Sequence, residues 1–574
     1  MIKKLAAHIG EYKLPSFLTP VCMILEVIME MIIPLLMASI IDKGVNMGDM
    51  GHVARVGAVM LAATLLSLAA GIGGAHFGAV ASAGFAKNLR QAMFSRIQEY
   101  SFSNIDKYST AGLVTRLTTD VTNVQNAYMM ILRMCFRAPV TMIVALFMAF
   151  SINARLSSIF LVVLVFLGVC LAFIMSRAFP LFSQVFKKYD ALNSSVQENV
   201  NAIRVVKAYV REEHENEKFR IASSNLKNLF VKAEKMVVLN MPLMQFCSYG
   251  CILILSYMGA KFIVAGDMTT GNLTSMLSYV MNILMSMMML SMVFVMITMS
   301  KAAAERIVEV LEEQPTIADG EENVMDVKDG SIVFDHVNFA YKKDGNMVLK
   351  DICLNIPAGA TVGILGGTGS AKSSLVNLIP RLYDVTEGSV KVGGLDVRKY
   401  NIEALRESVA VVLQKNVLFS GTINDNIRWG KEDATQEEIQ EVCKLACADE
   451  FIQTFPDKYE THIEQGGTNV SGGQKQRLCI ARALIKRPKV LILDDSTSAV
   501  DTATDARIRE AFAKKIPGTT KLIIAQRISS VQDSDIIVVL DDGKINGVGT
   551  HEELMANNAI YRDVYESQMK GSEE

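Results

Sequence analysis

A glycine-rich stretch near the middle of the chain carries the residue types that bind phosphate. The letters TVGILGGTGSAKSS (361–374) predict a strand, a turn of small residues and a helix start, the context that a phosphate-binding loop requires. Backbone amides in the turn are expected to surround phosphate oxygens, with Lys372 reaching the terminal phosphates and Ser373 binding Mg²⁺. The candidate contacts are Gly366, Gly367, Thr368, Gly369, Ser370, Ala371, Lys372, Ser373 and Ser374.

Two further motifs complete this chemistry. The apolar strand VLIL (490–493) ends in Asp494 and Asp495, and a carboxylate at the end of a buried strand can hold a phosphate-bound Mg²⁺. The letters VSGGQ (470–474) place small residues at the start of an amphipathic helix, which is an anion-binding arrangement. We therefore expect Asp494 to be a metal ligand, and we expect phosphate contacts from Ser471, Gly472, Gly473 and Gln474.

The elements that position these motifs differ between the two parts of the chain. Roughly the first 300 residues contain stretches long enough to span a bilayer, which takes about 20 apolar residues each. These stretches lie near 16–41, 56–82, 130–152, 156–178, 238–265 and 273–299. The remainder alternates strands and helices. The predicted fold class is a membrane α-helical domain of six transmembrane helices with long cytosolic extensions, fused to an α/β P-loop ATPase domain. The expected boundaries are 1–312 for the transmembrane domain, 313–330 for a polar linker and 331–574 for the nucleotide-binding domain.

Charge and cysteine usage narrow the classes of function. Lysine and arginine gather before the first span, after the sixth, and in the second and fourth connections, so both termini are expected to be cytosolic. The net charge of −2 gives no case for a nucleic-acid partner. The N-terminus has no cleavable signal pattern. Nine cysteines without a C-x-x-C pair argue against a disulfide scaffold and against a zinc site.

The order of these motifs resembles the nucleotide-binding domain of ATP-binding-cassette (ABC) transporters. The resemblance implies ATP and Mg²⁺ as cofactors, adenine stacking on Tyr341 after the strand SIVFDHVNFAY, and a Q-loop at Gln414 that touches Mg²⁺. It makes VSGGQ the signature motif, Asp494 the Walker B carboxylate and SAVD (498–501) the D-loop. Exporters of this family with fused domains have two cytosolic coupling helices, which 105–121 and 208–219 resemble; ordinary amphipathic helices are the alternative.

Several positions depart from the family pattern. Ala371 replaces the glycine before the P-loop lysine, and its Cβ costs about 1–2 kcal/mol if the backbone is left-handed. Asp495 stands where the family has a catalytic Glu; its shorter side chain matters because about 1 Å of misplacement can cost about 10²-fold in rate. Gln526 replaces the switch His and cannot carry its proton, and Gln465 replaces a Glu before the signature. The candidate catalytic residues are Asp495, Gln526 and Gln414.

In this family each ATP is held between the P-loop of one cassette and the signature of another. A chain with altered catalytic residues and an intact signature therefore resembles one half of the heterodimeric bacterial multidrug exporters. The implied partner is a homologous half-transporter that carries the catalytic Glu and the switch His. A slow homodimer and an engineered variant are the alternatives.

The expected function is ATP-driven export of amphipathic or hydrophobic compounds across a bacterial plasma membrane, with lipid and a small amphipathic substrate as further partners. A dedicated peptide or lipid exporter (flippase) and a regulatory ATP-binding subunit are alternatives. Glu26 and Glu30 share one face of the first span, and they either contact substrate or protons or bond a neighbouring helix. The stripe of Met281, Met285, Met288 and Met292 suits varied apolar ligands, and simple helix packing is the alternative.

Overall fold

A computed structural model describes residues 1–320, 322–342, 345–495 and 500–570. The chain divides into two compact units, which are described separately. The membrane unit comprises Met1–Gln98 and Thr110–Glu313, and the cassette unit comprises Glu99–Ser109 and Gln314–Glu574.

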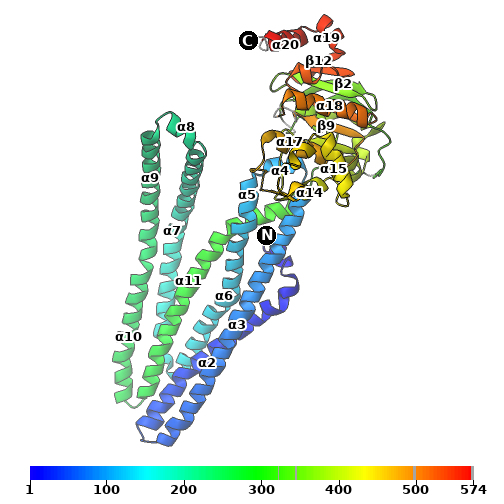
Figure 1. Cartoon of the computed structure of the whole chain (residues 1–574). Helices are drawn as coiled ribbons and strands as arrows, with labels where there is room; N and C mark the ends of the chain where they lie inside the picture. Colours follow the sequence, from blue (N-terminus) through cyan, green and yellow to red (C-terminus); the bar gives the residue numbers. More distant parts are fainter. Residues whose placement is uncertain (321, 343–344, 496–499, 571–574) are drawn as a thin grey trace. The chain divides into compact units, whose positions relative to one another are not determined.

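The membrane unit is entirely helical in its described part (Figure 1). Six of its helical segments are long and apolar enough to cross a membrane, which confirms the six expected spans. The helices are α1 (Ile2–Ala7), α2 (Lys13–Ser39), α3 (Met50–Gln98), α5 (Thr110–Thr115), α6 (Val121–Ile152), α7 (Ala154–Asn201), α8 (Ile203–Ala208), α9 (Glu212–Val238), α10 (Asn240–Val264) and α11 (Thr270–Glu312).

Side-chain caps fix where two of the spans begin. The Asn153 side chain accepts hydrogen bonds from the amides of Arg155 and Leu156, both at 3.1 Å, and starts α7 directly after α6. The Thr269 hydroxyl accepts from the amide of Asn272 at 3.2 Å and starts α11. Capping residues satisfy amides that have no partner within the helix, so both helices begin with capped amides directly after a short connection.

The long helices pack in two groups. Helices α2, α3, α6 and α11 contact one another, whereas α7 packs against α9 and α10, and Figure 1 shows the α7–α9 pair extending beyond the other helices. The apolar core of this unit includes Val27, Met31, Leu156 and Phe160. Tyr279 is fully buried there and donates to the carbonyl of Met31 at 2.9 Å, which ties α11 to α2.

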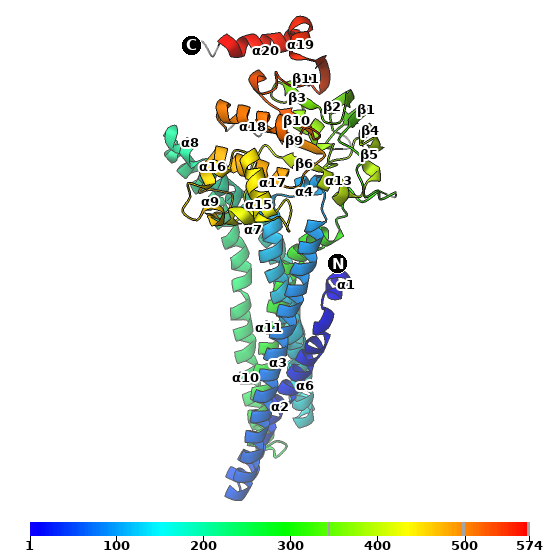
Figure 2. The ribbon, with the colours of Figure 1, turned by 45° about the vertical axis from the view of Figure 1, so that its right-hand side comes forward.

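The cassette unit contains two main sheets; Figure 2 labels their strands except β12, which is labelled in Figure 1. A four-stranded antiparallel sheet has the order β2-β1-β4-β5, and a six-stranded sheet has the order β12-β11-β3-β10-β9-β6, parallel except at β12. Their strands are β1 (Ile332–Phe339), β2 (Leu349–Ile356), β3 (Thr361–Gly366), β4 (Glu387–Val392), β5 (Leu395–Asp396), β6 (Val409–Val412), β9 (Val490–Asp494), β10 (Thr520–Ile524), β11 (Ile536–Asp541) and β12 (Lys544–Gly549).

Helices cover these sheets and complete the α/β architecture, which confirms the predicted fold class. A pair of two-residue strands, β7 (Gly421–Thr422) and β8 (His462–Ile463), forms a small third sheet. The helices are α12 (Lys372–Asn377), α13 (Ile402–Ser408), α14 (Ile423–Arg428), α15 (Gln436–Leu445), α16 (Asp449–Ile452), α17 (Gly472–Leu484), α18 (Thr502–Lys515), α19 (His551–Asn557) and α20 (Ala559–Lys570).

A short segment from the first half of the chain belongs to the cassette unit. Helix α4 (Phe102–Lys107) lies between α3 and α5 in sequence, yet the Asp106 carboxylate accepts a hydrogen bond from the Tyr383 hydroxyl at 2.6 Å. The ring of Phe102 meets Tyr383 edge to face at 6.0 Å. The range 105–121 covers the end of α4, α5 and a π-helical turn, and 208–219 covers the last residue of α8 and the start of α9, so their role as coupling helices stays a prediction.

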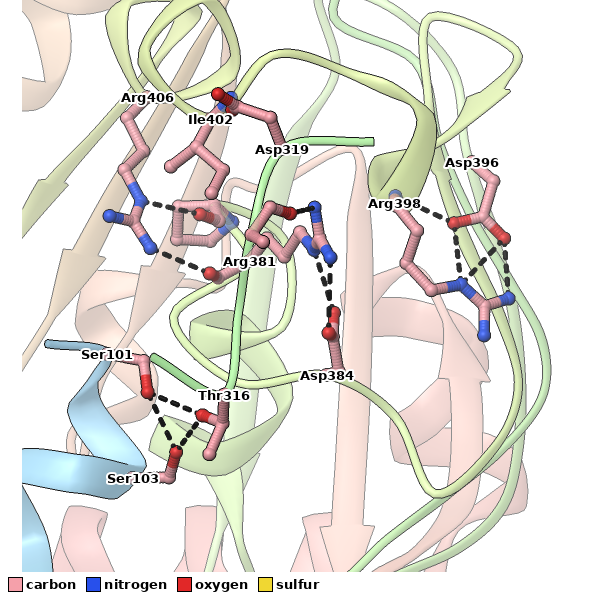
Figure 3. A network of polar contacts seen from close by, with 12 residues as sticks. Ser101, Ser103, Thr316, Asp319, Arg381, Asp384, Asp396, Arg398, Ile402 and Arg406 are labelled. Carbon is pink, nitrogen blue, oxygen red and sulfur yellow. Dashed lines mark hydrogen bonds and ion pairs between the residues drawn. The ribbon is translucent and has the colours of Figure 1, made fainter. Parts of the chain in front are cut away.

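Polar contacts also hold the start of the linker within the cassette unit (Figure 3). The Thr316 hydroxyl lies 2.5 Å from the hydroxyls of Ser101 and Ser103. Further along the linker, Arg381 donates to the carbonyl of Ala318 at 2.9 Å, and the Asp319 carboxylate accepts from the amide of Ile402 at 2.9 Å. The segment after Glu313 is thus bound to the cassette by specific hydrogen bonds.

Candidate nucleotide-binding site

The candidate site lies at one edge of the six-stranded sheet. Strands β3, β10, β9 and β6 are parallel neighbours, so their carboxyl ends meet at the same edge, where open α/β sheets bind ligands. The residues that follow these strands are the P-loop after β3, Gln526 after β10, Asp495 after β9 and Gln414 after β6. All of them line one pocket of about 540 Å³, within the usual size of ligand sites.

Two glycine conformations and the Lys372 side chain stabilise the shape of the P-loop. Gly366 has a φ of 156° and Gly369 a φ of 87°, and an added Cβ at Gly366 would meet the carbonyl of Leu540 at 2.3 Å. Lys372 Nζ donates to the carbonyls of Gly366 and Gly367, both at 2.8 Å. The ammonium group therefore lies over the turn whose amides are expected to receive phosphate.

Ala371 adopts a left-handed conformation, with φ 73° and ψ 24°, immediately before α12. Glycine adopts this conformation without the steric cost that a Cβ adds. The expected steric cost of a Cβ at Ala371 therefore applies, because the backbone there is left-handed.

The two expected Mg²⁺ ligands lie together. Ser373 Oγ donates to Asp494 Oδ1 at 3.1 Å. Burial raises the pKa of the Asp494 carboxyl, the bond from Ser373 opposes that rise, and the nearby Asp495 adds to it. Burial also lowers the pKa of Lys372, against the attraction of both aspartates. A hydroxyl and a desolvated carboxylate at this separation fit a hard cation that takes oxygen ligands, as Mg²⁺ does.

The two substituted catalytic positions bond directly to each other. Gln526 Nε2 donates to Asp495 Oδ2 at 2.8 Å. Asp495 itself has a left-handed φ of 48°, and its amide donates to the carbonyl of Ile524 at 3.1 Å. One carboxylate oxygen of Asp495 is thus occupied by a neutral amide rather than left to polarise water.

The C-terminal helix contributes residues that sequence reasoning missed. Ile560, Tyr561 and Val564 of α20 line the same pocket. Gln568, also on α20, accepts from the amide of Ile528 at 2.9 Å and donates to the carbonyl of Gln526 at 2.8 Å. No motif marks this helix, because its contribution consists of packing and of bonds to backbone.

The expected adenine contact lies next to the P-loop helix. The Tyr341 hydroxyl is 2.8 Å from Ser374 Oγ, and the Tyr341 ring meets Tyr383 edge to face at 5.1 Å. The ring is about half exposed. Tyr341 is not among the described residues that line the pocket, so its role toward adenine stays a prediction.

The signature residues do not join this pocket within one chain. Ser471 caps α17: its hydroxyl accepts from the amide of Gln474 at 3.2 Å, and its own amide donates to the Gln474 side chain at 2.9 Å. Ser471 and Gln474 are exposed or half-exposed, and neither they nor Gly472 and Gly473 are among the described pocket residues. Residues 498 and 499 of the expected D-loop (498–501) lie outside the described residues.

The candidate substrate residues fall on two separate surfaces of the membrane unit. Glu26 and Glu30 of α2 both pair with Arg137 of α6, at 2.5 and 2.9 Å. The second oxygen of Glu26, Oε2, is buried and has no hydrogen-bond partner among the described residues. Two carboxylates thus share one guanidinium at membrane depth.

The methionine stripe is exposed at three of its four positions. Met281, Met285 and Met292 are exposed, and Met288 is half-buried. Met288 packs against the apolar core of the unit, and Met281 Sδ accepts a hydrogen bond from the Ser248 hydroxyl at 3.3 Å. Helix packing therefore accounts for part of the stripe.

Comparison with known proteins agrees with this geometry. The family described as "ABC transporter transmembrane region" matches residues 16–288, and the family described as "ABC transporter" matches residues 349–498. The ABC transporter ATP-binding protein YfiB of Bacillus subtilis (strain 168) is 37% identical over the whole length of both chains. The ATP-dependent lipid A-core flippase of Syntrophus aciditrophicus (strain SB) is 32% identical, covering 84% of this chain and 80% of the flippase. The putative multidrug export ATP-binding/permease protein YgaD of Bacillus subtilis (strain 168) is 30% identical, covering 83% of each chain.

The fold and the site thus define a multi-pass membrane protein with a fused ATP-binding domain. The chain belongs to the ABC transporters and has the architecture of an exporter half-transporter. Its cassette is of the ATP-hydrolysing kind.

Proposed function

We propose that this chain is one subunit of a heterodimeric exporter of amphipathic compounds, and that its own ATP site binds nucleotide but hydrolyses it slowly. Ser373 and Asp494 would hold Mg²⁺, Lys372 and the P-loop amides would hold phosphate, and Gln414 would contact the metal. Bound Mg²⁺ neutralises charge on the phosphates. Both termini and the cassette would lie in the cytosol of a bacterium.

The observation that carries the slow site is the hydrogen bond from Gln526 to Asp495 at 2.8 Å. A general base must reach the proton that it abstracts, and Asp is one methylene shorter than the family's Glu. The amide of Gln526 also holds one of its carboxylate oxygens. Since Gln526 cannot become positively charged, no second group in this pair compensates for the misplaced carboxylate.

The need for a partner is supported by the separation of the two ATP-binding surfaces. The P-loop lines the pocket, whereas the exposed Ser471 and its glycines start α17 elsewhere on the same unit. A second cassette in head-to-tail contact would bring its signature to the P-loop of this chain. In return, Ser471–Gln474 of this chain would contact the P-loop of the second cassette. The partner would supply the catalytic Glu and switch His for the faster site.

Transport follows from coupling the two ATP sites to the spans. Nucleotide favours the conformation to which it binds more tightly, so ATP would shift the pair from an inward-facing to an outward-facing state, and hydrolysis at the partner's site would reset it. Amphipathic substrates are supported by the exposed methionine stripe, since thioethers adapt to varied apolar ligands.

The lipid alternative rests on one named relative, the lipid A-core flippase. Stimulation of ATPase activity distinguishes the two classes: cationic or neutral drugs should stimulate the reconstituted pair more than purified lipids do. Stimulation by a single lipid alone would favour the flippase reading.

The partner is tested by affinity purification of the tagged full-length chain from its native membranes. We expect a second ABC half-transporter at near-equal amounts, identified by mass spectrometry, and the purified pair should hydrolyse ATP. The matched control is Ser471→Arg, which fills the exposed signature surface while leaving the chain's own P-loop intact; it should abolish hydrolysis at the partner's site. Recovery of the chain only with itself would contradict the heterodimer.

A further inference from the structure

Three side chains with metal-binding atoms meet on the outer sheet of the cassette, away from the ATP pocket. His336 lies on β1, and Asp351 and Cys353 lie on β2, the outermost strand of the four-stranded sheet (Figure 2). Their ligand atoms all lie within 4.8 Å of one another. None of the three lines the pocket described above.

The contacts within this group bring an imidazole nitrogen, a carboxylate oxygen and a thiol sulfur together. His336 Nδ1 lies 2.7 Å from Asp351 Oδ1 and 3.5 Å from Cys353 Sγ. The imidazole and the carboxylate are each more than 70% exposed, and Cys353 is exposed as well. Water can therefore complete the coordination of any ion held here.

Two irregularities in the strand pairing produce this arrangement. Residues Phe334 and Val337 of β1 pair with Leu354 and Ile352, so two residues of β1 oppose the single residue Cys353. A second shift follows between Val337 and Phe339. Such bulges redirect side chains, and the Val337–Ile352 pair between the two shifts leaves His336 and Cys353 as the next residues along the two strands.

The backbone at the two bulges is unusual for residues with side chains. His336 has a φ of 47° and Asp351 a φ of 51°. The Asn338 side chain accepts from the amide of Asp351 at 2.9 Å, which holds Asp351 in this conformation. Left-handed non-glycine residues persist only where their surroundings support them, and they gather at functional sites.

We propose that His336, Asp351 and Cys353 form a site for Zn²⁺ or a similar borderline-soft divalent cation, with water as the fourth ligand. Nitrogen, oxygen and thiolate sulfur are the three donor types that proteins use for zinc. A tetrahedral site with metal–ligand distances near 2.0–2.3 Å separates its ligands by about 3.3–3.6 Å. The Sγ to Nδ1 distance already fits, and the exposed Asp351 side chain has to move away from Nδ1 by about 0.6 Å. The thiol loses its proton to solvent on binding.

This site departs from the expectation drawn from cysteine spacing. No C-x-x-C motif predicts the site, because strand pairing, and not local sequence spacing, brings residues 336, 351 and 353 together. The bound ion would join β1 to β2, and Tyr341 lies two residues after the end of β1. The site stands independently of how fast the ATP site hydrolyses.

The experiment measures alkylation of Cys353 in the purified full-length chain by a water-soluble maleimide, followed by mass spectrometry of its peptide. Among the nine cysteines, all of them described, only Cys353 is exposed, so the readout is local. Free Zn²⁺ on the order of 10 μM should slow the reaction at least about tenfold, and Mg²⁺ should not.

Four variants separate a built site from a lone thiolate. His336→Asn and Asp351→Asn keep a residue type that tolerates the left-handed backbone and should each remove the Zn²⁺ protection. His462→Asn, at another exposed histidine of the cassette, should retain it. Thiolate-to-metal absorption by Co²⁺-loaded wild-type protein should appear and should be lost in Cys353→Ser. Absence of protection in the wild type, or equal protection in His336→Asn and Asp351→Asn, would overturn the proposal.

Discussion

Ala371 and Asp495 are non-glycine residues with a left-handed backbone conformation, and both line the ATP pocket. At Ala371 the backbone conformation is the one for which the family uses glycine. At Asp495 the same kind of conformation follows β9 and directs the carboxylate to Gln526. The two positions show how single substitutions alter a nucleotide site without altering the fold that carries it.

The stability of variants at Ala371 is expected to follow how readily each residue type adopts a left-handed backbone. Glycine should be at least as stable as alanine, because it removes a cost of about 1–2 kcal/mol that is partly offset by unfolded-chain entropy. Valine should be worse by about 2 kcal/mol, since β-branched residues are outliers there. The measurement is the thermal unfolding midpoint of each full-length variant.

Ala506 provides the matched control. It is exposed within α18, where glycine should cost about 1 kcal/mol and valine less. The same rank order at both positions would show that the Ala371 conformation does not govern its stability.

Asp494 predicts a pH dependence for the nucleotide-free protein. Burial raises the pKa of its carboxyl above the ordinary aspartate value, so the folded state binds this proton more tightly than the unfolded state does. The contribution to stability therefore falls as pH rises from the ordinary value of about 3.9 through the raised one. At neutral pH Asp494→Asn should unfold at a higher temperature than the wild type, and the difference should shrink near pH 4.

The same variant should lose the stabilisation that Mg²⁺ and ATP give to the wild type. Asp425→Asn is the control, for which the opposite change in unfolding midpoint at neutral pH is expected. A hydrogen bond from the Thr422 backbone lowers the pKa of Asp425, so this carboxylate stabilises the fold at neutral pH and its loss should lower the unfolding midpoint. An Asp494→Asn protein that is less stable than wild type without nucleotide would contradict the burial argument.

At the scale of elements, α2 and α6 are joined by an unbalanced charge cluster. Arg137 faces two carboxylates, and Oε2 of Glu26 is buried without a described partner. Removing one member of a buried ion pair leaves an uncompensated charge, at a cost of about 3–5 kcal/mol. The cluster therefore ties the two helices together.

Arg137→Gln is expected to reduce the yield of folded, monodisperse protein sharply, because two carboxylates then remain at membrane depth without a cation. Adding Glu26→Gln and Glu30→Gln should restore much of that yield. Arg177→Gln is the control, since no ion pair of Arg177 is found among the described residues. A triple variant as poor as the single one would show that Arg137 acts through something other than these carboxylates.

The sequence predicted elements well where a motif or a hydropathy run marks them. Six apolar runs became six spans, and the motifs around Lys372, Asp494 and Gln526 identified residues that line one pocket. It could not show that α4 groups with the cassette, because the Tyr383–Asp106 contact joins residues far apart in sequence. Helix α20 and the bulges at His336 and Asp351 were missed for the same reason: polar helices and strand registers carry no local signal.

At the scale of the whole molecule, the proposed function gives one chain half of each of two ATP sites. Its pocket contains a P-loop and Mg²⁺ ligands, and its signature surface is exposed elsewhere on the cassette. This division explains why catalytic residues in the chain's own pocket can change while Ser471–Gln474 keep the family pattern.

The most direct measurement compares ATP turnover by the purified chain alone, reconstituted in lipid, with that of Asp495→Glu/Gln526→His. The account predicts that the wild type binds ATP but turns it over very slowly. The double variant, which restores both groups in a dimer of this chain, should be about 10²-fold faster, and Asp495→Asn should stay slow. Brisk turnover by the wild type alone, with little gain in the double variant, would contradict the claim that Asp495 and Gln526 make this site slow.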